Sequence, residues 1–325
     1  GIYRSDAYPP LMASLLFVAP SDLGETVLAT GALAYALNEG DRVCVASEAE
    51  ATALFRAAPG LTTSHVIAPR AGPGDLWRLW SALARTRFDL VIDARAGLLG
   101  KLIPSSRRAA LKPAAKLRHR TEDWADAMES ARPLAPKLWL DGAARVKSAA
   151  LAPDAAPLLV LAPGGANVGK RWPWERFAAV ARRLVSGPLG QARILVLGAA
   201  RRDAELIGMI VRSLGADGVI AADVSHGLDL LDAAALMERA TLCLGNDNAL
   251  THIAAAMGAP TLTLFGPTDE RARAPFGPRV RTLRGRGLAE IAALTGLDAN
   301  TAMEDVSIDA VEAEALDLLH AGGLR

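Results

Sequence analysis

The chain has 325 residues, 51% of them hydrophobic, and its 36 lysines and arginines nearly balance its 35 aspartates and glutamates. This length suits two α/β domains, and the composition excludes a disordered chain and a general nucleic-acid binder. No apolar run approaches the roughly 20 residues that a membrane-spanning helix needs.

Short apolar runs alternate with helical patterns through the first part of the chain. They predict strands at 15–20, 42–47, 65–69 and 88–94, with helices at 26–38, 51–57 and 76–85 between them. Strands that are apolar on both faces and separated by helices are typical of a parallel sheet covered by helices.

A stretch that is rich in alanine, proline and turn residues follows, from Leu140 to Pro157, and we interpret it as a linker between domains. The α/β pattern then resumes. It predicts strands at 157–165, 192–200, 217–223, 240–247 and 260–267, and a final amphipathic helix with Asp309 as its N-cap. The sequence therefore predicts two Rossmann-like domains, 14–150 and 157–325, whose parallel sheets face a central cleft.

Both cysteines, Cys44 and Cys243, lie inside strand-like apolar runs, so we expect buried, reduced side chains. The N-terminus lacks the basic-then-apolar order of a secretory signal. Residues 1–11 precede the first predicted strand, and we interpret them as a vector remnant or a flexible arm.

A glycine-rich loop is predicted between the strand that ends near Ala162 and a helix that opens near Trp174. Gly164 and Gly165 allow the backbone to approach a ligand closely, and consecutive amides in such a loop can bind an anion. Lys170 belongs to the same loop. The alternative is a tight turn with a solvated lysine.

A second candidate loop carries Asn246, Asp247 and Asn248 between a strand and a helix predicted at 249–257. The free amides and the dipole of that helix N-terminus suit a diphosphate. Asp247 would otherwise be an ordinary N-cap, and His252, one turn into the helix, would otherwise be a packed histidine.

Together these segments resemble glycosyltransferase family 9, the ADP-heptose:lipopolysaccharide heptosyltransferases and their relatives. The resemblance rests on PGGANVGKRWPWERF, GNDNALTHIAAAMGAPTLTLFGPTDE and PSDLGETVLATGAL, and it extends to the tail MEDVSIDAVEAEALDLL. It implies the GT-B fold, in which the N-terminal domain binds the acceptor and the C-terminal domain binds a nucleotide-sugar donor. ADP-heptose is the donor and the lipopolysaccharide core the acceptor that the family suggests.

The resemblance also implies roles for residues at matching positions. Lys170 would contact the donor diphosphate, and Asp247 the hydroxyls of the donor sugar. Main-chain amides after Asp247 would bind phosphate. The chain departs from the family here, because Asn248 and Ala249 stand where Ser or Thr and then Gly are usual, which puts donor geometry or identity in question. The full donor-binding set implied is Gly164, Gly165, Lys170, Asp203 (near the ribose), Asn246, Asp247, Asn248, Ala249, Leu250 and His252.

The resemblance places the general base at Glu25, where the family has aspartate after glycine. A carboxylate within hydrogen-bond reach can deprotonate an acceptor hydroxyl, although Glu25 also suits the first turn of a helix. The implied reaction is direct displacement with inversion, with Glu25, Lys170 and Asp247 as catalytic residues. No metal site and no cofactor are expected, and the chain contains no D-x-D triplet.

No acidic residue occurs from Ala94 through Thr121. We interpret the basic residues of this segment as an acceptor-binding surface for an anionic glycolipid, with a solvated face as the alternative. The same surface could rest on the inner face of the inner membrane of a cytoplasmic enzyme. Trp77 and Trp80 could line an acceptor or membrane face, although core packing is favoured. The predicted acceptor-binding residues are Arg95, Lys101, Arg107, Arg108, Arg118 and Arg120.

Two other functions stay open. One is a nucleotide-sugar 2-epimerase of the same fold, which would need several carboxylates and a histidine in its cleft. The other is a protein that binds nucleotide sugar without turnover, as the changes at Glu25, Asn248 and Ala249 permit. A Rossmann dehydrogenase is disfavoured because no G-x-G-x-x-G opens the first helix.

Overall fold

The computed structural model describes residues 12–95, 97–112, 116–153, 155–294 and 296–322. The chain divides into two compact units. The first runs up to Asp141 and includes Asp229–Leu231, and the second holds the remainder from Gly142. Residues 1–11, interpreted above as a remnant or an arm, lie outside the described residues.

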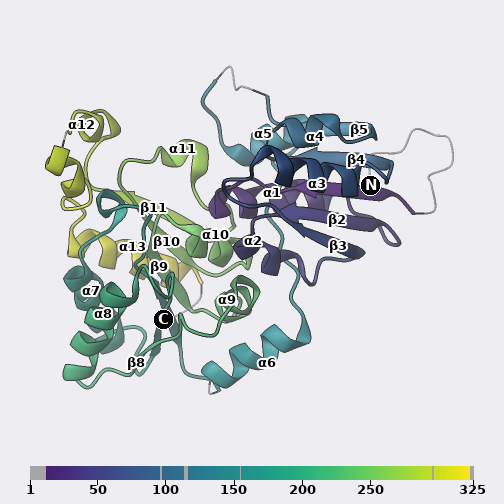
Figure 1. Cartoon of the computed structure of the whole chain (residues 1–325). Coiled ribbons are helices and arrows are strands. Elements are labelled where there is room, and N and C mark those ends of the chain that lie inside the picture. The colour runs from purple at the N-terminus through teal and green to yellow at the C-terminus, as the bar shows by residue number, and fades with distance from the viewer. Residues whose placement is uncertain (1–11, 96, 113–115, 154, 295, 323–325) are drawn as a thin grey trace. The chain divides into compact units, whose positions relative to one another are not determined.

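The first unit is built on a five-stranded sheet in the order β3-β2-β1-β4-β5, with parallel pairing between neighbours (Figure 1). Its elements are β1 (Ser14–Val18), α1 (Leu23–Ala36), β2 (Arg42–Ser47), α2 (Ala49–Thr52), η1 (Ala53–Phe55), β3 (Leu61–Val66), α3 (Pro73–Leu83), β4 (Phe88–Asp93), α4 (Leu98–Leu102), β5 (Ser105–Ala110) and α5 (Arg120–Ala127).

One cluster of the core of the first unit forms between the central strands and helix α3. Leu16 and Val18 of β1 pack with Leu79 and Leu83 of α3 in one buried cluster. These two leucines are four residues apart, so they lie on one face of the helix and turn it toward the sheet.

The second unit is built on a six-stranded sheet in the order β11-β10-β9-β6-β7-β8, again with parallel pairing (Figure 1). Its elements are α6 (Gly142–Leu151), β6 (Leu158–Ala162), η2 (Val168–Lys170), α7 (Trp174–Ser186), β7 (Arg193–Val196), α8 (Ala204–Ala216), β8 (Ala221–Asp223), α9 (Leu230–Met237, which begins in the segment assigned to the first unit), β9 (Leu242–Asn246), α10 (Ala249–Ala256), β10 (Thr261–Phe265), α11 (Glu270–Arg273), β11 (Val280–Arg284), α12 (Leu288–Ala292), η3 (Gly296–Thr301) and α13 (Ile308–Ala321).

Helices α7, α8 and α13 share one hydrophobic core with the central strands of this sheet. Trp172 and Phe177 are fully buried there, with their rings edge to face at a centroid distance of 5.0 Å. The indole N–H of Trp172 donates to the Val306 carbonyl at 2.8 Å, which satisfies the one polar atom of the ring. This packing fixes the chain directly after Lys170.

The predicted α/β alternation is confirmed, and two parallel sheets form. The stretch expected as a linker, 140–157, instead contains helix α6 over Gly142–Leu151. Strands β5 and β11 form where no strand was predicted, and β8 is shorter than the run 217–223. Both Cys44 and Cys243 are buried and free, and burial raises the pKa of the Cys243 thiol to about 12. Within the described residues, no helix is long and apolar enough to span a membrane.

Candidate functional site

Two loops of the second unit meet at one edge of its sheet. Strands β6 and β9 are parallel neighbours, with Ala162 paired to Gly245 at their carboxyl ends. The glycine-rich loop follows β6, and the Asn246–Asn248 loop follows β9, so the topology brings the two predicted motifs together. Across this junction, Lys170 Nζ lies 2.8 Å from Asp247 Oδ2.

Asp247 is largely buried beside two basic groups. Its side chain is 10% exposed, and His252 Nε2 lies 4.0 Å from Oδ1. Burial alone raises the pKa of this carboxyl, but the proximity of His252 and the charge and hydrogen bond of Lys170 outweigh it. The net result is a pKa well below the ordinary value of 3.8. Asp247 is therefore a stable, negatively charged acceptor for hydrogen bonds.

The depressed pKa of Asp247 predicts acid-sensitive stability. The ionised Asp247 carboxylate adds to the free energy of unfolding. This stabilisation is fully present above about pH 4 and is lost as the pH falls through the pKa that Asp247 has in the folded protein. We expect urea midpoints of the wild type and Asp247→Asn to differ at pH 7 and to converge as the pH is lowered below about 4. Parallel curves over this range would show that Asp247 is not linked to folding.

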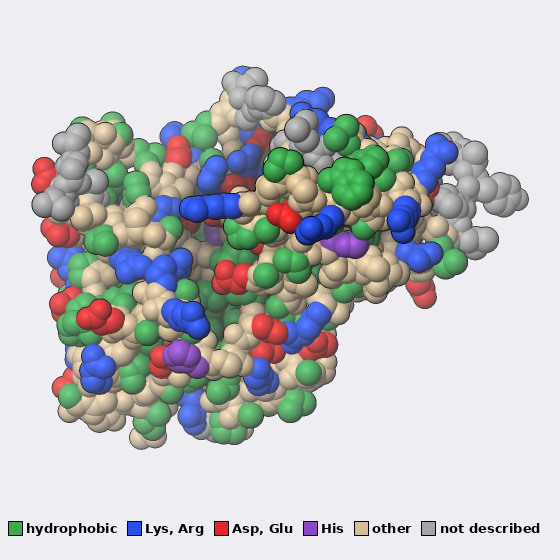
Figure 2. All heavy atoms as spheres, in the orientation of Figure 1, with side chains coloured by type: hydrophobic (Ala, Val, Ile, Leu, Met, Phe, Trp, Pro, Cys, Tyr) green, Lys and Arg blue, Asp and Glu red, His purple; other side chains and the backbone are tan. Residues whose placement is uncertain are grey.

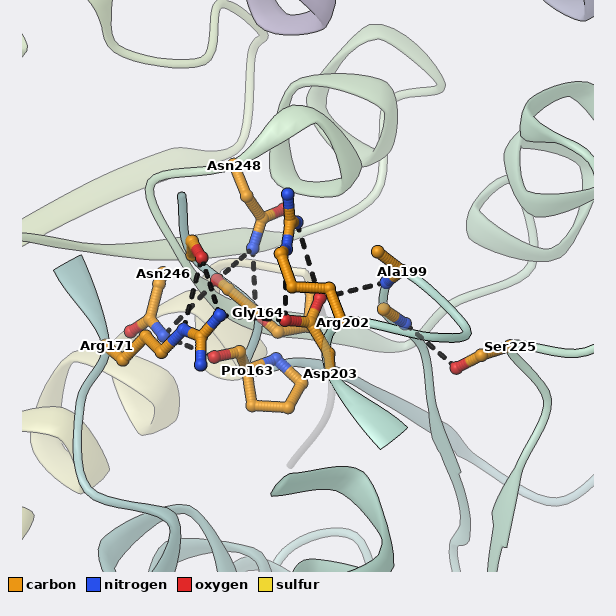
Figure 3. A network of polar contacts seen from close by, with 12 residues as sticks. Pro163, Gly164, Arg171, Ala199, Arg202, Asp203, Ser225, Asn246 and Asn248 are labelled. Atoms are coloured by element: carbon orange, nitrogen blue, oxygen red, sulfur yellow. Dashed lines mark hydrogen bonds and ion pairs between the residues drawn. The ribbon is translucent and has the colours of Figure 1, made fainter. Parts of the chain in front are cut away.

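Two asparagines hold the glycine-rich loop in place (Figure 3). Asn246 Nδ2 donates to the Pro163 carbonyl at 2.7 Å, and its Oδ1 accepts from the Trp172 amide at 3.2 Å. Asn248 Nδ2 donates to the carbonyls of Ala162 and Gly164 at 2.9 and 3.0 Å. These bonds join both ends of the loop to the β9–α10 segment and so fix the position of the loop.

Asn248 also caps helix α10. Its Oδ1 accepts from the amides of Leu250 and Thr251 at 2.9 and 3.4 Å. The Asn248 amide group also donates to the glycine-rich loop, so both polar atoms of this side chain are bonded within the protein. Among the described residues, none accepts a hydrogen bond from the main-chain N–H of Asn248 or Ala249. Of the main-chain amides at 248–250 that were expected to bind phosphate, those of Asn248 and Ala249 therefore stay available, whereas the Leu250 amide is used by the helix cap.

Asp203, predicted near the ribose, lies behind the glycine-rich loop and is 1% exposed. Its carboxylate accepts from Arg171 at 3.2 Å, from Arg202 at 3.3 Å and from the Ala199 amide at 2.9 Å (Figure 3). Arg171 also donates twice to the Gly165 carbonyl, at 3.0 and 3.1 Å. The Asp203 carboxylate is thus bonded to protein groups on several sides. Through Arg171 it helps to hold the glycine-rich loop in place.

Gly164 has no room for a side chain, because a Cβ there would lie 2.4 Å from Asp203 Oδ2. We expect Gly164→Ala to destabilise the second unit by about 1–3 kcal/mol, since the buried carboxylate cannot move freely. Gly215→Ala is the matched control, because no atom lies within 4 Å of a Cβ at that position in helix α8. Equal urea midpoints for the two variants would contradict the packing argument.

Glu25, the predicted base, lies in the first unit, in the first turn of α1. Asp22 caps this helix by accepting from the Glu25 amide at 2.9 Å. The Glu25 carboxylate accepts from Arg120 at 2.8 and 3.4 Å, and Arg120 in turn donates to Asp123 at 3.0 Å. This pairing across 95 residues of sequence was not predicted. It holds the carboxylate in one orientation.

The basic segment is less positive in the structure than in the sequence. Acidic groups from outside the segment pair with four of its six predicted acceptor-binding residues, and the role of these residues in acceptor binding stays a prediction. The pairs are Arg95–Glu48, Arg107–Glu129, Arg118 with Asp123 and Asp126, and Arg120 with Glu25 and Asp123.

The other two predicted residues are Lys101 in α4 and Arg108 in β5, and the Arg108 guanidinium reaches the end of α4. Arg108 donates to the carbonyls of Lys101 and Ile103 at 3.0 and 2.7 Å. No described carboxylate pairs with either side chain in the structure. Within the residues described, no group of three or more His, Cys, Asp or Glu side chains is placed to hold a metal ion, and the metal independence of the reaction stays a prediction.

Comparison with known proteins identifies the family of the segment that carries these two loops. Residues 124–300 match glycosyltransferase family 9 (heptosyltransferase), a segment that includes Lys170 and Asp247 but not Glu25. The lipooligosaccharide heptosyltransferase 2 of Haemophilus influenzae is 27% identical over 131 residues, which are 39% of this chain and 36% of that protein. The match thus spans about a third of that relative's length.

Solved structures extend the likeness to nearly the whole chain. Escherichia coli ADP-heptose lps heptosyltransferase II superposes with a TM-score of 0.76 at 18% identity, covering 95% of this chain and 99% of the other. E. coli heptosyltransferase WaaC with ADP gives a TM-score of 0.72 at 18% identity, covering 94% and 99%. These likenesses confirm the predicted fold class, two parallel-sheet α/β domains of the GT-B type. With the family match over 124–300, they show that the chain belongs to glycosyltransferase family 9, the heptosyltransferases.

Proposed function

We propose that this protein transfers heptose from ADP-heptose to an anionic glycolipid acceptor, the lipopolysaccharide core. The observation that carries the proposal is the Lys170–Asp247 pair at the entry to helix α10, inside the segment that matches the family. An ammonium, a buried carboxylate and a helix N-terminus are the groups that a sugar diphosphate requires from its binding site.

In this proposal Lys170 contacts the donor diphosphate and stabilises the negative charge that develops on the departing ADP. Asp247 accepts hydrogen bonds from the hydroxyls of the donor sugar. The amides of Asn248 and Ala249, with the loop at Gly164 and Gly165, bind phosphate oxygens. Because lysine and main-chain amides supply the positive charge, the reaction needs no metal ion and no cofactor.

Glu25 acts as the general base in the same proposal. It removes the proton from the acceptor hydroxyl as the oxygen attacks the anomeric carbon, the bond to the diphosphate breaks, and the configuration inverts. Arg120 is a positioning residue, because it holds the Glu25 carboxylate through two hydrogen bonds. A location in the cytoplasm, beside the membrane that carries the acceptor, completes the proposal.

The first test is calorimetric titration of the protein with ADP, UDP, GDP and dTDP, followed by incubation with ADP-heptose and lipopolysaccharide core. We expect ADP to bind selectively and heptose to appear on the acceptor. Preference for another diphosphate would reject ADP-heptose while keeping the donor site. Binding without product would favour the non-catalytic alternative, and interconversion of free nucleotide sugars would favour an epimerase.

A further inference from the structure

An exposed apolar group lies on the first unit, over helices α3 and α4. Trp77 is 64% exposed and Leu102 is 63% exposed, with Leu76 at 36% beside them. The two helices pack together, and the Trp80 indole N–H donates to the Leu102 carbonyl at 3.2 Å. Figure 2 shows hydrophobic side chains gathered over α3 with lysine and arginine side chains beside them.

The core does not use Trp77. Leu79 and Leu83 turn their side of α3 toward the sheet, and both are buried. Trp77 precedes Leu79 by two residues, so it points away from that face. The expectation that Trp77 is a core residue is therefore wrong, whereas Trp80 packs partly against the core. Packing in the core therefore does not explain why Trp77 stands exposed to solvent next to other exposed apolar side chains.

Basic side chains adjoin these apolar groups directly. Arg78 follows Trp77 with its side chain 80% exposed, and Lys101 precedes Leu102. Arg108 is bonded to the carbonyls at the end of α4. Asp75 is the acidic residue of α3, and it lies 3.5 Å from Arg78. We name the surface formed by Leu76, Trp77, Arg78, Lys101, Leu102 and Arg108 the α3–α4 face.

We propose that the α3–α4 face binds the surface of an anionic phospholipid bilayer. An exposed tryptophan prefers the boundary between headgroups and acyl chains, where its ring is apolar and its N–H stays wet. Leucines beside it enter the acyl region, and arginine and lysine side chains extend toward lipid phosphates. The α3–α4 face combines all of these groups on two adjacent helices and on Arg108 of strand β5.

Charge complementarity selects this occupant over a second copy of the chain. A symmetric dimer through the α3–α4 face would bring Arg78, Lys101 and Arg108 of one copy against the same residues of the other. Such like charges repel in an interface of low dielectric constant. The phosphate groups of anionic lipids are negatively charged, so they attract these side chains instead of repelling them. The inference assigns membrane contact to a specific surface of the first unit, and it does not depend on the chemistry of the proposed function.

The test is co-sedimentation of the full chain with vesicles of phosphatidylcholine, alone or mixed with one third phosphatidylglycerol, at low and high salt. We expect binding to the mixed vesicles that weakens at high salt. Trp77→Ala combined with Leu102→Ala should lower the partition coefficient about tenfold or more, because it removes the inserted groups. Arg78→Gln combined with Lys101→Gln should remove most of the preference for phosphatidylglycerol.

Val146→Ala is the matched control, since this valine of α6 is 72% exposed and lies in the second unit. It should bind vesicles like the wild type. Circular dichroism and light scattering on every variant report folding and oligomeric state. The proposal is overturned by absent vesicle binding, by equal loss in the control, or by a dimer that the Trp77 variant abolishes. Vesicle binding without ADP binding would reject the proposed function and leave this inference standing.

Discussion

Replacing Glu25 with glutamine is expected to lower kcat for heptosyl transfer by about 10²–10⁴-fold, the usual effect of removing a general base. Glutamine keeps the size of the side chain and one acceptor oxygen, so the contact with Arg120 is weakened rather than lost. Because donor binding involves residues of the other unit, the Kd for ADP should not change. The measurement is initial-rate kinetics with saturating ADP-heptose and acceptor.

Asp22→Asn is the matched control for this experiment. It removes an exposed carboxylate three residues away, and asparagine caps a helix as well as aspartate does. Its turnover should stay close to that of the wild type. Equal losses in both variants would point to a disturbed α1 N-terminus, and full activity of Glu25→Gln would remove Glu25 from the mechanism.

Replacing Lys170 with alanine is expected to weaken ADP binding by about tenfold to 100-fold, the equivalent of one lost hydrogen bond to a charged group. The same change removes the closest cation from Asp247, so the negative charge of this carboxylate is less balanced and repels the diphosphate. Both effects act in the same direction. Calorimetric titration with ADP measures the loss, and a thermal unfolding curve reports any change in stability separately.

Lys147→Ala is the control for Lys170, because Lys147 also pairs with a buried aspartate of the second unit, Asp232, at 2.7 Å. This pair does not join the two loops of the donor site. The control should lose a similar ion pair while binding ADP normally. If both variants bind equally weakly, loss of structure explains the result and Lys170 has no specific role.

The central strands could be predicted from the sequence, whereas the edge strands β5 and β11 could not. Strands β6 and β9 are buried on both faces and read as continuous apolar runs. Strands β5 and β11 lie at the edges of their sheets and contain exposed arginines, so they lack that signal. Burial on two faces is therefore what makes a parallel strand recognisable in sequence.

In the candidate site, too, some contacts could be predicted from the sequence and others could not. Lys170 and Asp247 meet because their loops follow neighbouring parallel strands, and the family resemblance had assigned both residues to donor binding. The partners of Glu25 and Asp203 were not predictable, because their arginines belong to other elements and their spacing carries no period. The pair of Glu25 and Arg120 shows why. Arg120 lies in a segment without acidic residues, and the carboxylate of Glu25 comes next to it only when the chain folds.

The carboxylate of Asp203 has an electrostatic consequence for the neighbouring loop. An acid behind the loop that we propose binds the diphosphate would by itself repel it, yet two guanidinium groups pair with this acid. Arg171, Arg202 and Asp203 together therefore carry a net positive charge, and the buried Asp203 carboxylate holds both guanidinium groups in place. Such an anchored cation keeps its orientation as a ligand approaches, so less reorganisation is needed than with a solvated arginine.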